Sequence, residues 1–374
     1  MTTDQNYQQI YRVGGILDAG FVGQITYTIS LDQVYDELDI HFSFDKRLYS
    51  ESDVTPELID RLQTLCTAKY NAPTYPVEEF RQTILHEMKT EIHTMAELND
   101  NFIGCIHRQL TDRHMLYTKE FTSDGCLAQD TFSGVLKVTV LVFNVLLDNT
   151  QYTLTVSGHP VGQGVIAPNF NLMDTVKTAA GNAGASNAAG SADNSCDAES
   201  APASAVATAG SSGVSGAGSA ATAGDSSTTG SSSAGNTVTA STSFKRLELH
   251  NHTVESDGSL TCQELTEYLA ADHVDAFAIT DHNTTSGQKK IEQLLEEKHY
   301  PISLIRGMEY TTYFGHILCL NLSKYVPWNS IDQHRPELLF EAAREKGALV
   351  GIAHPFSYGD PFARGCRFEM TISD

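Results

Sequence analysis

A single stretch, residues 247–283, concentrates side chains that bind metal ions. It reads LELHNHTVESDGSLTCQELTEYLAADHVDAFAITDHN and contains His250, His252, Asp257, Asp281 and His282. Because side chains on a strand alternate between two faces, His250 and His252 are expected to point the same way. Two imidazoles placed in this way can bind one divalent cation such as Zn, Mn or Fe. For this stretch alone, a surface histidine pair beside a turn carboxylate is the alternative.

The same layout recurs downstream. Four apolar runs finish at metal-ligand residues and a fifth begins with one; the residues at these ends are His250, Asp281 with His282, Glu309, His354 and His316. In parallel β/α folds, ligands and catalytic groups collect at the carboxyl ends of strands. We therefore expect these side chains to converge on one metal site, with Asp257 folding back toward it from a Ser-Asp-Gly turn.

The elements that would hold these residues alternate between strands and helices. We expect strands at residues 247–250, 276–280, 302–306, 316–320 and 349–353, and helices at 261–271, 288–298 and 332–346. Thr261 and Glu264 have the spacing of a capping box, and Gly347 is suited to end the third helix. The alternation favours a parallel, barrel-like β/α sheet.

The motifs LELHNHTVESDG, AITDHN, GMEYTTYFGH and GIAHPF together resemble those of the PHP (polymerase and histidinol phosphatase) superfamily, in particular its CehA/McbA-type metallohydrolase branch. The resemblance covers residues 244–374. It implies a distorted (β/α)7 barrel that holds two or three divalent metal ions, of which Mn, Zn or Fe are the candidates.

The resemblance also implies a role for each ligand. His250 and His252 would bind a first metal, and Glu309 would bridge it to a second. His316 and His354 would complete the second metal's ligands, and Asp257 with His282 would hold a third. We place Asp281 beside Glu309 in the catalytic set, where it orients a ligand or a water molecule by hydrogen bonding.

One departure from the superfamily pattern concerns the end of the sequence. The superfamily closes its site with an Asp-x-His pair on a late strand, and no such pair follows His354. The resemblance therefore implies that the sixth and seventh strands of the barrel are missing. We expect a C-terminally truncated chain in which the first and third metals bind weakly.

The expected activity is metal-dependent hydrolysis, in which clustered cations lower the pKa of a water molecule that attacks phosphorus or a carbonyl carbon. Three hypotheses stay open. The first is a phosphoesterase for a small phosphorylated metabolite or nucleotide. The second is a carbamate or ester hydrolase of the CehA/McbA type, and the third is an inactive or incomplete metal-binding module. Candidate substrate contacts are Arg306, Tyr310, Tyr313 and Arg364.

Residues 1–177 are predicted to form a separate α+β domain of unknown function. Period-two alternation predicts strands at residues 24–31 and 38–44, and apolar runs at 135–147 and 152–156 predict further strands. Proline near each start predicts helices over 56–71 and 76–100. Five histidines of this part lack the spacing of metal ligands and are expected to be packed or solvated: His41, His86, His93, His107 and His114.

Residues 178–243 consist almost entirely of Ala, Gly, Ser, Thr and Asn. Such a segment cannot bury enough apolar area to offset its chain entropy, so we expect a disordered linker. It separates the N-terminal domain from the metallohydrolase domain, residues 244–374.

Composition limits the partners and the compartment. The formal net charge is −22 and no region is basic, which argues against binding to duplex nucleic acid. The 7 cysteines are scattered without CxxC spacing, as is typical of a reducing compartment. No apolar run is long enough to span a bilayer. We therefore expect a cytoplasmic protein that acts on a small molecule without binding a membrane.

Overall fold

The computed structural model describes residues 7–70, 74–86, 88–108, 110–146, 149–161, 245–331 and 335–354. These described residues belong to one compact unit. The predicted linker, residues 178–243, and the candidate contact Arg364 lie outside them. Within the described ranges, no helix is long and apolar enough to cross a membrane.

Seven antiparallel strands build the N-terminal sheet, in the order β1-β7-β2-β6-β3-β4 with β5 paired to β2. They are β1 (Gln8–Leu17), β2 (Gly23–Phe44), β3 (Glu91–Leu98), β4 (Asn101–Ile106), β5 (Asp112–Tyr117), β6 (Phe132–Asn144) and β7 (Thr150–Pro160). The first half of β2 pairs with β6 and, after a register shift beyond Leu31, its second half pairs with β7 and β5. The two strands predicted at 24–31 and 38–44 are therefore one continuous strand that joins two layers.

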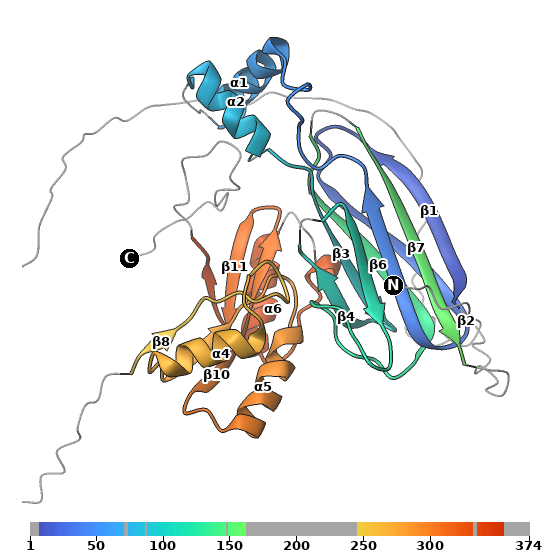
Figure 1. Cartoon of the computed structure of the whole chain (residues 1–374), viewed down its shortest axis with the longest axis vertical. Coiled ribbons are helices and arrows are strands. Elements are labelled where there is room, and N and C mark those ends of the chain that lie inside the picture. The colour runs from blue at the N-terminus through green and yellow to red at the C-terminus, as the bar shows by residue number, and fades with distance from the viewer. Residues whose placement is uncertain are drawn as a thin grey trace, which may run out of the picture. The chain divides into compact units, whose positions relative to one another are not determined.

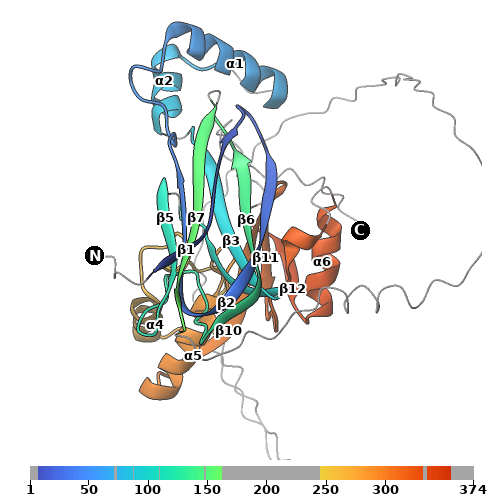
Figure 2. The same cartoon turned by 90° about the vertical axis from the view of Figure 1, so that its right-hand side faces the viewer.

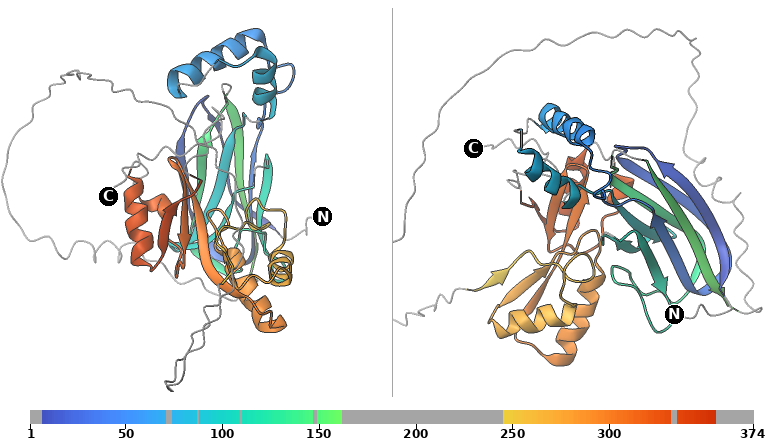
Figure 3. Two further views of the ribbon diagram at one scale, coloured as in Figure 1. Left: turned by 90° about the vertical axis from the view of Figure 1, so that its left-hand side faces the viewer. Right: turned by 45° about the horizontal axis from the view of Figure 1, so that its top comes forward.

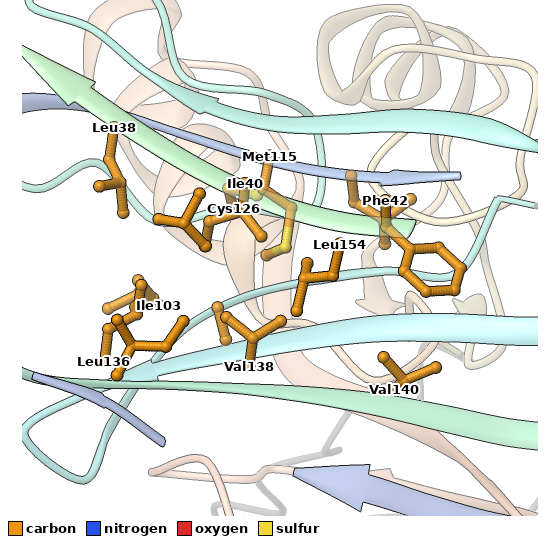
Figure 4. Packing of buried hydrophobic residues seen from close by; sticks show 14 of the residues in the cluster. Leu38, Ile40, Phe42, Ile103, Met115, Cys126, Leu136, Val138, Val140 and Leu154 are labelled. Atoms are coloured by element: carbon orange, nitrogen blue, oxygen red, sulfur yellow. The ribbon is translucent and has the colours of Figure 1, made fainter. Parts of the chain in front are cut away.

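The core of this sheet lies between those layers. Figure 4 shows Leu38, Ile40 and Phe42 of β2 above Leu136 and Val138 of β6, and all five side chains are fully buried. The period of two puts them on inward faces, where each contributes roughly 1.5–3 kcal/mol by leaving water. The alternation read from the sequence is therefore the pattern that fixes this core.

Two helices, α1 (Pro56–Tyr70) and α2 (Val77–His86), lie at one end of the long strands (Figure 2 and Figure 3). The prediction for 56–71 is confirmed, but the helix predicted over 76–100 is wrong beyond His86, because β3 begins at Glu91. His86 and His93 consequently do not share a helix.

The misassigned segment is β3 itself. All eight of its residues are buried, because it lies between β6 and β4 and is covered on both faces. A strand buried on both faces does not alternate apolar and polar residues, so helical periodicity in its sequence is accidental.

The C-terminal sheet has five strands in the order β12-β11-β10-β9-β8. They are β8 (Leu247–Glu248), β9 (Ala276–Ile279), β10 (Ser303–Thr312), β11 (Gly315–Leu320) and β12 (Leu349–Ile352). The helices are α4 (Cys262–Ala271), α5 (Ser286–Lys298) and α6 (Pro336–Glu345), with a short 3-10 helix, η1 (Trp328–Ser330). Figure 1 shows α4 and α5 beside β10. All five predicted strands and all three predicted helices are present.

This α/β sheet is mixed, so the expectation of a parallel sheet is only partly correct. Strands β8, β9 and β10 are parallel, whereas β11 runs antiparallel to both β10 and β12. Only Tyr313 and Phe314 separate β10 from β11, and a connection that short can join only antiparallel strands. Among the described residues the sheet stays open, with β8 and β12 at its edges.

The two sheets share one apolar core. Side chains of β3, β4 and β6 form a single buried cluster with those of β10, β11 and α6; among its members are Met95, Cys105, Leu141, Phe143, Met308, Tyr310, Ile317, Cys319 and Leu339. The N-terminal strands thus use one face for their own core and the other for this shared cluster.

Helix α4 begins with the predicted capping box. The Thr261 side chain accepts a hydrogen bond from the Glu264 amide, and the Glu264 carboxylate accepts one from the Thr261 amide. We expect Thr261→Ala to lower the free energy of unfolding by about 1 kcal/mol, because it leaves an amide of the first turn without its acceptor. Urea denaturation would measure this loss, and Thr261→Ser, which keeps the hydroxyl, is the matched control. A loss of equal size in both variants would contradict the capping explanation.

Candidate metal centre

Glu309 lies at the centre of the candidate site. It is fully buried on β10, beside the end of β9, where its carbonyl accepts a hydrogen bond from the Asn283 amide at 3.0 Å. Its Oε2 lies 2.7 Å from His250 Nε2 and 3.0 Å from His252 Nε2. Its Oε1 lies 3.0 Å from His316 Nδ1 and 3.1 Å from His354 Nε2. Each carboxylate oxygen therefore faces two imidazoles.

The two sets of donor atoms have the dimensions of cation-binding faces. The Nε2 atoms of His250 and His252 are 3.1 Å apart, and His316 Nδ1 is 3.2 Å from His354 Nε2. Ligand atoms about 2.0–2.2 Å from one cation, at angles near 90–110°, lie about 2.8–3.6 Å from one another. Each oxygen of Glu309 thus forms a triangle with two imidazole nitrogens, and the distances between these three atoms are close to those between ligands of one cation. The residues therefore fit a pair of divalent metal ions that share this carboxylate.

The His-x-His pair lies just beyond a strand end. β8 ends at Glu248, two residues earlier than predicted, so His250 and His252 follow the strand. Between them, Asn251 is held to β9: its amide donates to Thr280 Oγ1 at 2.9 Å and its side-chain amide donates to the Ala278 carbonyl at 3.0 Å. These bonds, rather than strand pairing, direct both imidazoles to the same oxygen.

His316 reaches the cluster through the antiparallel strand. It lies near the start of β11, and because β11 runs opposite to β10, the beginning of β11 meets the carboxyl end of β10. His354 follows the end of β12. The geometry explains why one histidine of the set precedes its apolar run and the others follow theirs.

The buried carboxylate and its imidazoles shift one another's protonation. Burial by itself would raise the pKa of Glu309, but hydrogen bonds from His250, His252 and His316 hold that pKa far below its usual range. Burial would lower the pKa of His252, yet the Glu309 carboxylate outweighs it and raises that pKa. Glu309 is therefore an anion, which is the state that binds cations.

Asp281 follows the end of β9, and its carboxylate holds the turn that carries Asp257. It is buried and accepts hydrogen bonds from the Thr253 amide at 2.7 Å, the Thr253 hydroxyl at 2.8 Å and the Ser256 hydroxyl at 2.6 Å. Burial raises its pKa, and these bonds partly offset the rise. With both oxygens engaged, Asp281 shapes the turn that carries Asp257.

We expect Asp281→Ala to lower the free energy of unfolding of the metal-free protein by about 3 kcal/mol, because the buried Thr253 amide loses its acceptor. Chemical denaturation in the presence of a chelator would measure it. Asp281→Asn keeps one acceptor oxygen and should recover part of the loss; equal stability of the Ala variant and the unaltered protein would refute this role.

A further group of donor atoms gathers on Asp257. Its Oδ2 lies 3.8 Å from His282 Nε2 and 3.6 Å from His107 Nε2, and its Oδ1 lies 3.9 Å from His252 Nδ1. His282 Nε2 is also 3.6 Å from Glu309 Oε2, so His282 lies between the donors around Glu309 and those around Asp257. The structure thus brings together all the sequence-predicted ligands, and it adds His107, which was expected to be packed or solvated.

No local signal in the sequence could have identified His107. It follows β4, far along the chain from Asp257, and has no ligand at a short spacing. Another group missed in the same way is His41, Asp112 and His114, which adjoin on the paired strands β2 and β5. Only the register of β2 and β5 makes neighbours of these three residues.

Three of the candidate substrate contacts, Arg306, Tyr310 and Tyr313, lie among the described residues and take part in packing or pairing within the protein. The Tyr310 hydroxyl is buried and donates to the Val326 carbonyl at 3.1 Å. Tyr313 packs against the rings of Phe143 and Trp328. Arg306 pairs with Glu292 on α5. Their proposed contact with substrate receives no support from these positions.

Comparison with known proteins gives partial matches. Residues 7–160 match the family model described as "Family of unknown function (DUF6669)". An uncharacterized protein of Methanocaldococcus jannaschii is 33% identical over 84 residues, which are 22% of this chain and 46% of that protein. The 5'-3' exoribonuclease Rnm of Escherichia coli is 34% identical over 79 residues, 20% of this chain and 27% of that protein. The 5'-3' exoribonuclease of Haemophilus influenzae is 36% identical over 87 residues, 22% and 31% of the two chains.

Two solved structures are also similar over part of the chain. One is a two-domain protein containing a predicted PHP-like metal-dependent phosphoesterase from Bacteroides vulgatus, with a TM-score of 0.27 and 23% identity over 30% of this chain and 36% of that one. The other is an amidohydrolase from Chromobacterium violaceum, with a TM-score of 0.21 and 28% identity over 27% and 36% of the two chains. The chain spans less than half the length of the curated relatives it matches. It is therefore similar over about a fifth of its length to proteins that include exoribonucleases, and over residues 7–160 to a family of unknown function.

Proposed function

We propose that this chain is a metal-dependent phosphoesterase of the PHP type that acts on a small phosphorylated metabolite or nucleotide. The observation that carries the proposal is the pair of donor triangles on Glu309, one on each carboxylate oxygen. A carboxylate shared in this way places two cations side by side, as the two-metal arrangement for phosphoryl chemistry requires.

The residues that would hold the cations follow from the triangles. Glu309 would contribute to both, with His250 and His252 on one side and His316 and His354 on the other. Imidazole and carboxylate ligands suit Mn, Zn and Fe. Bound there, the cations supply an electrophile that acidifies water and offsets the charge developing on a phosphate oxygen.

The chain's own groups prepare this site in two ways. Burial of Glu309 keeps an anion away from bulk water, so its attraction for cations is weakly screened. Asp281 and Asn251 fix the segments that carry Asp257 and the His-x-His pair. The side chains around Glu309 therefore need little rearrangement when cations bind.

Similarity to exoribonucleases favours a phosphate ester over a carbamate as the substrate. The test offers a phosphomonoester, a phosphodiester, a 5'-phosphorylated oligoribonucleotide and a naphthyl carbamate, each with added Mn. We expect hydrolysis of a phosphate ester. Cleavage of the carbamate alone would replace the proposal with the carbamate hydrolase hypothesis, and no hydrolysis with any divalent metal would support the inactive metal-binding module.

Removing metal should abolish the activity. We expect dialysis against a chelator to lower phosphoesterase turnover at least about 1,000-fold, because the cations supply several kcal/mol of transition-state stabilisation. Added Mn should restore it. His159→Ala alters a histidine of β7 that is paired with Asp36, so it should respond to chelator and Mn as the unaltered protein does. Full activity in the chelated protein would contradict metal dependence.

A further inference from the structure

We propose that His107, from the N-terminal sheet, is a direct ligand of a third divalent cation, together with Asp257 and His282. The inference deepens the proposed function and rests on it, because it assigns to the same centre a ligand from outside the C-terminal motifs. It would make the N-terminal sheet part of the metal site.

The geometry of the three donors carries the proposal. One oxygen, Asp257 Oδ2, lies 3.6 Å from His107 Nε2 and 3.8 Å from His282 Nε2, and the three ligand atoms all lie within 4.8 Å of one another. A separation of 3.6 Å is longer than a good hydrogen bond, whereas it is close to the spacing of donors around one cation, about 2.8–3.6 Å. Binding of one ion would draw the three donors inward from these separations.

The two imidazoles are arranged to share a cation. Their rings stack with centroids 4.2 Å apart and an interplanar angle of 16°. Both rings direct Nε2 toward the same carboxylate oxygen, and both side chains are buried. Two imidazoles and one carboxylate form a donor set of the kind that binds Zn, Mn or Fe.

The surroundings hold His107 and the Asp257 turn together. On its other side the His107 ring packs against His93, with centroids 4.1 Å apart. The neighbouring Arg108 donates to the Gly258 carbonyl at 3.3 Å, next to Asp257. The segment that carries His107 is thus tied directly to the turn that carries Asp257.

A second tie fixes the same turn from Gly125. The Gly125 amide donates to the buried Glu255 carboxylate at 3.0 Å, and its carbonyl accepts from Thr284 Oγ1 at 2.9 Å. Glu255 lies two residues before Asp257 and Thr284 two residues after His282. The position of His107 against these ligands is therefore set by several bonds.

Counting bound metal separates this proposal from the proposed function. The full chain is dialysed against buffered free Mn or Zn, and bound metal per chain is measured by plasma mass spectrometry. We expect three ions in the unaltered protein, two in His107→Ala and one in Glu309→Gln. The ion lost in His107→Ala should bind at least about 100-fold more weakly, since losing even an outer hydrogen-bond partner costs 10- to 100-fold.

His159→Ala is the matched control, because it removes a histidine of the same sheet outside every donor group, and it should keep three ions. Three ions of unchanged affinity in His107→Ala would overturn the proposal, even with phosphoesterase activity intact. Two ions in the unaltered protein, both lost in Glu309→Gln, would overturn it as well. The three proteins could instead bind three, two and one ions as expected but show no phosphoesterase activity. That result would refute the proposed function and leave His107 as a ligand.

A ligand exchange tests direct contact and guards against misfolding of the alanine variant. His107→Cys loaded with Co should show a thiolate-to-cobalt charge-transfer band that the unaltered protein lacks, although both contain the other cysteines. A correctly folded His107→Cys that binds three Co ions without this band would mean that residue 107 acts only through packing, and would overturn the proposal.

Discussion

Glu309→Gln is expected to lower phosphoesterase turnover by about three orders of magnitude or more, to the level of the metal-free protein. The variant retains the size of the side chain but removes its charge and one of its two acceptor oxygens. Four imidazoles approach these oxygens at 2.7–3.1 Å, so one donor triangle loses its oxygen and the other keeps only an uncharged amide oxygen. Activity and bound metal should therefore fall together.

Two further variants sharpen this test. Glu267→Gln changes an exposed carboxylate of α4 that bonds Tyr300 and Gln263, and should leave activity unchanged. Glu309→Asp keeps the charge but shortens the reach, so it should recover part of the metal binding. A Glu309→Gln protein that still holds its paired ions and turns over at the normal rate would remove the basis of the proposed function.

Gly125→Ala is expected to lower the free energy of unfolding by about 3 kcal/mol or more. Gly125 has φ +80°, a conformation unfavourable for alanine, and an added Cβ would lie 2.3 Å from the Cys105 carbonyl oxygen. Relieving that overlap would move the backbone whose amide and carbonyl bond Glu255 and Thr284. Thermal denaturation should show a lower midpoint, together with weaker metal binding at Asp257.

Gly20→Ala is the control for backbone conformation alone. Gly20 has φ +74°, but nothing lies within 4 Å of its added Cβ. It should cost only about 1 kcal/mol, the ordinary price of a left-handed residue other than glycine. Equal decreases in the free energy of unfolding for Gly20→Ala and Gly125→Ala would show that the close approach to Cys105 does not contribute to the cost.

The C-terminal elements could be predicted because their signals are local. The Thr261 capping box, the apolar run before Asp281 and the glycine after α6 each mark a boundary within a few residues. The direction of β11 was the exception. It depends on the two-residue connection at Tyr313 and Phe314, which is too short for the crossover that the β/α rhythm predicts.

The N-terminal strands that were missed carry weak signals for physical reasons. β4 contains Gly104, where a Cβ would lie 2.7 Å from Cys126 Sγ, so close packing demands a residue that is unfavourable in strands. β1 contains Gly14 and Gly15, and a Cβ at Gly15 would overlap the ring of Tyr152. In β3, burial on both faces removes the alternation that predicts a strand, and the remaining spacing of apolar residues predicts a helix.

The residues of the candidate site also divide into those that the sequence predicts and those that it does not. Residues at strand ends, such as His282 and Glu309, could be expected to meet because strand ends share one edge of a sheet. His107 could not, since its approach to Asp257 depends on the packing of one sheet against another. The sequence gives no such guide for Tyr310, because an aromatic residue near a ligand looks the same in sequence whether it faces substrate or the core.

The apolar cluster common to both sheets limits how the chain can be divided into soluble fragments. A fragment that begins near Lys245 would present Met308, Tyr310 and Ile317 to water, all of which are fully covered in the intact chain. A contiguous exposed apolar surface of that kind promotes self-association. The C-terminal half is therefore not expected to stay in solution by itself, and supplying residues 7–161 as a separate polypeptide should restore its solubility.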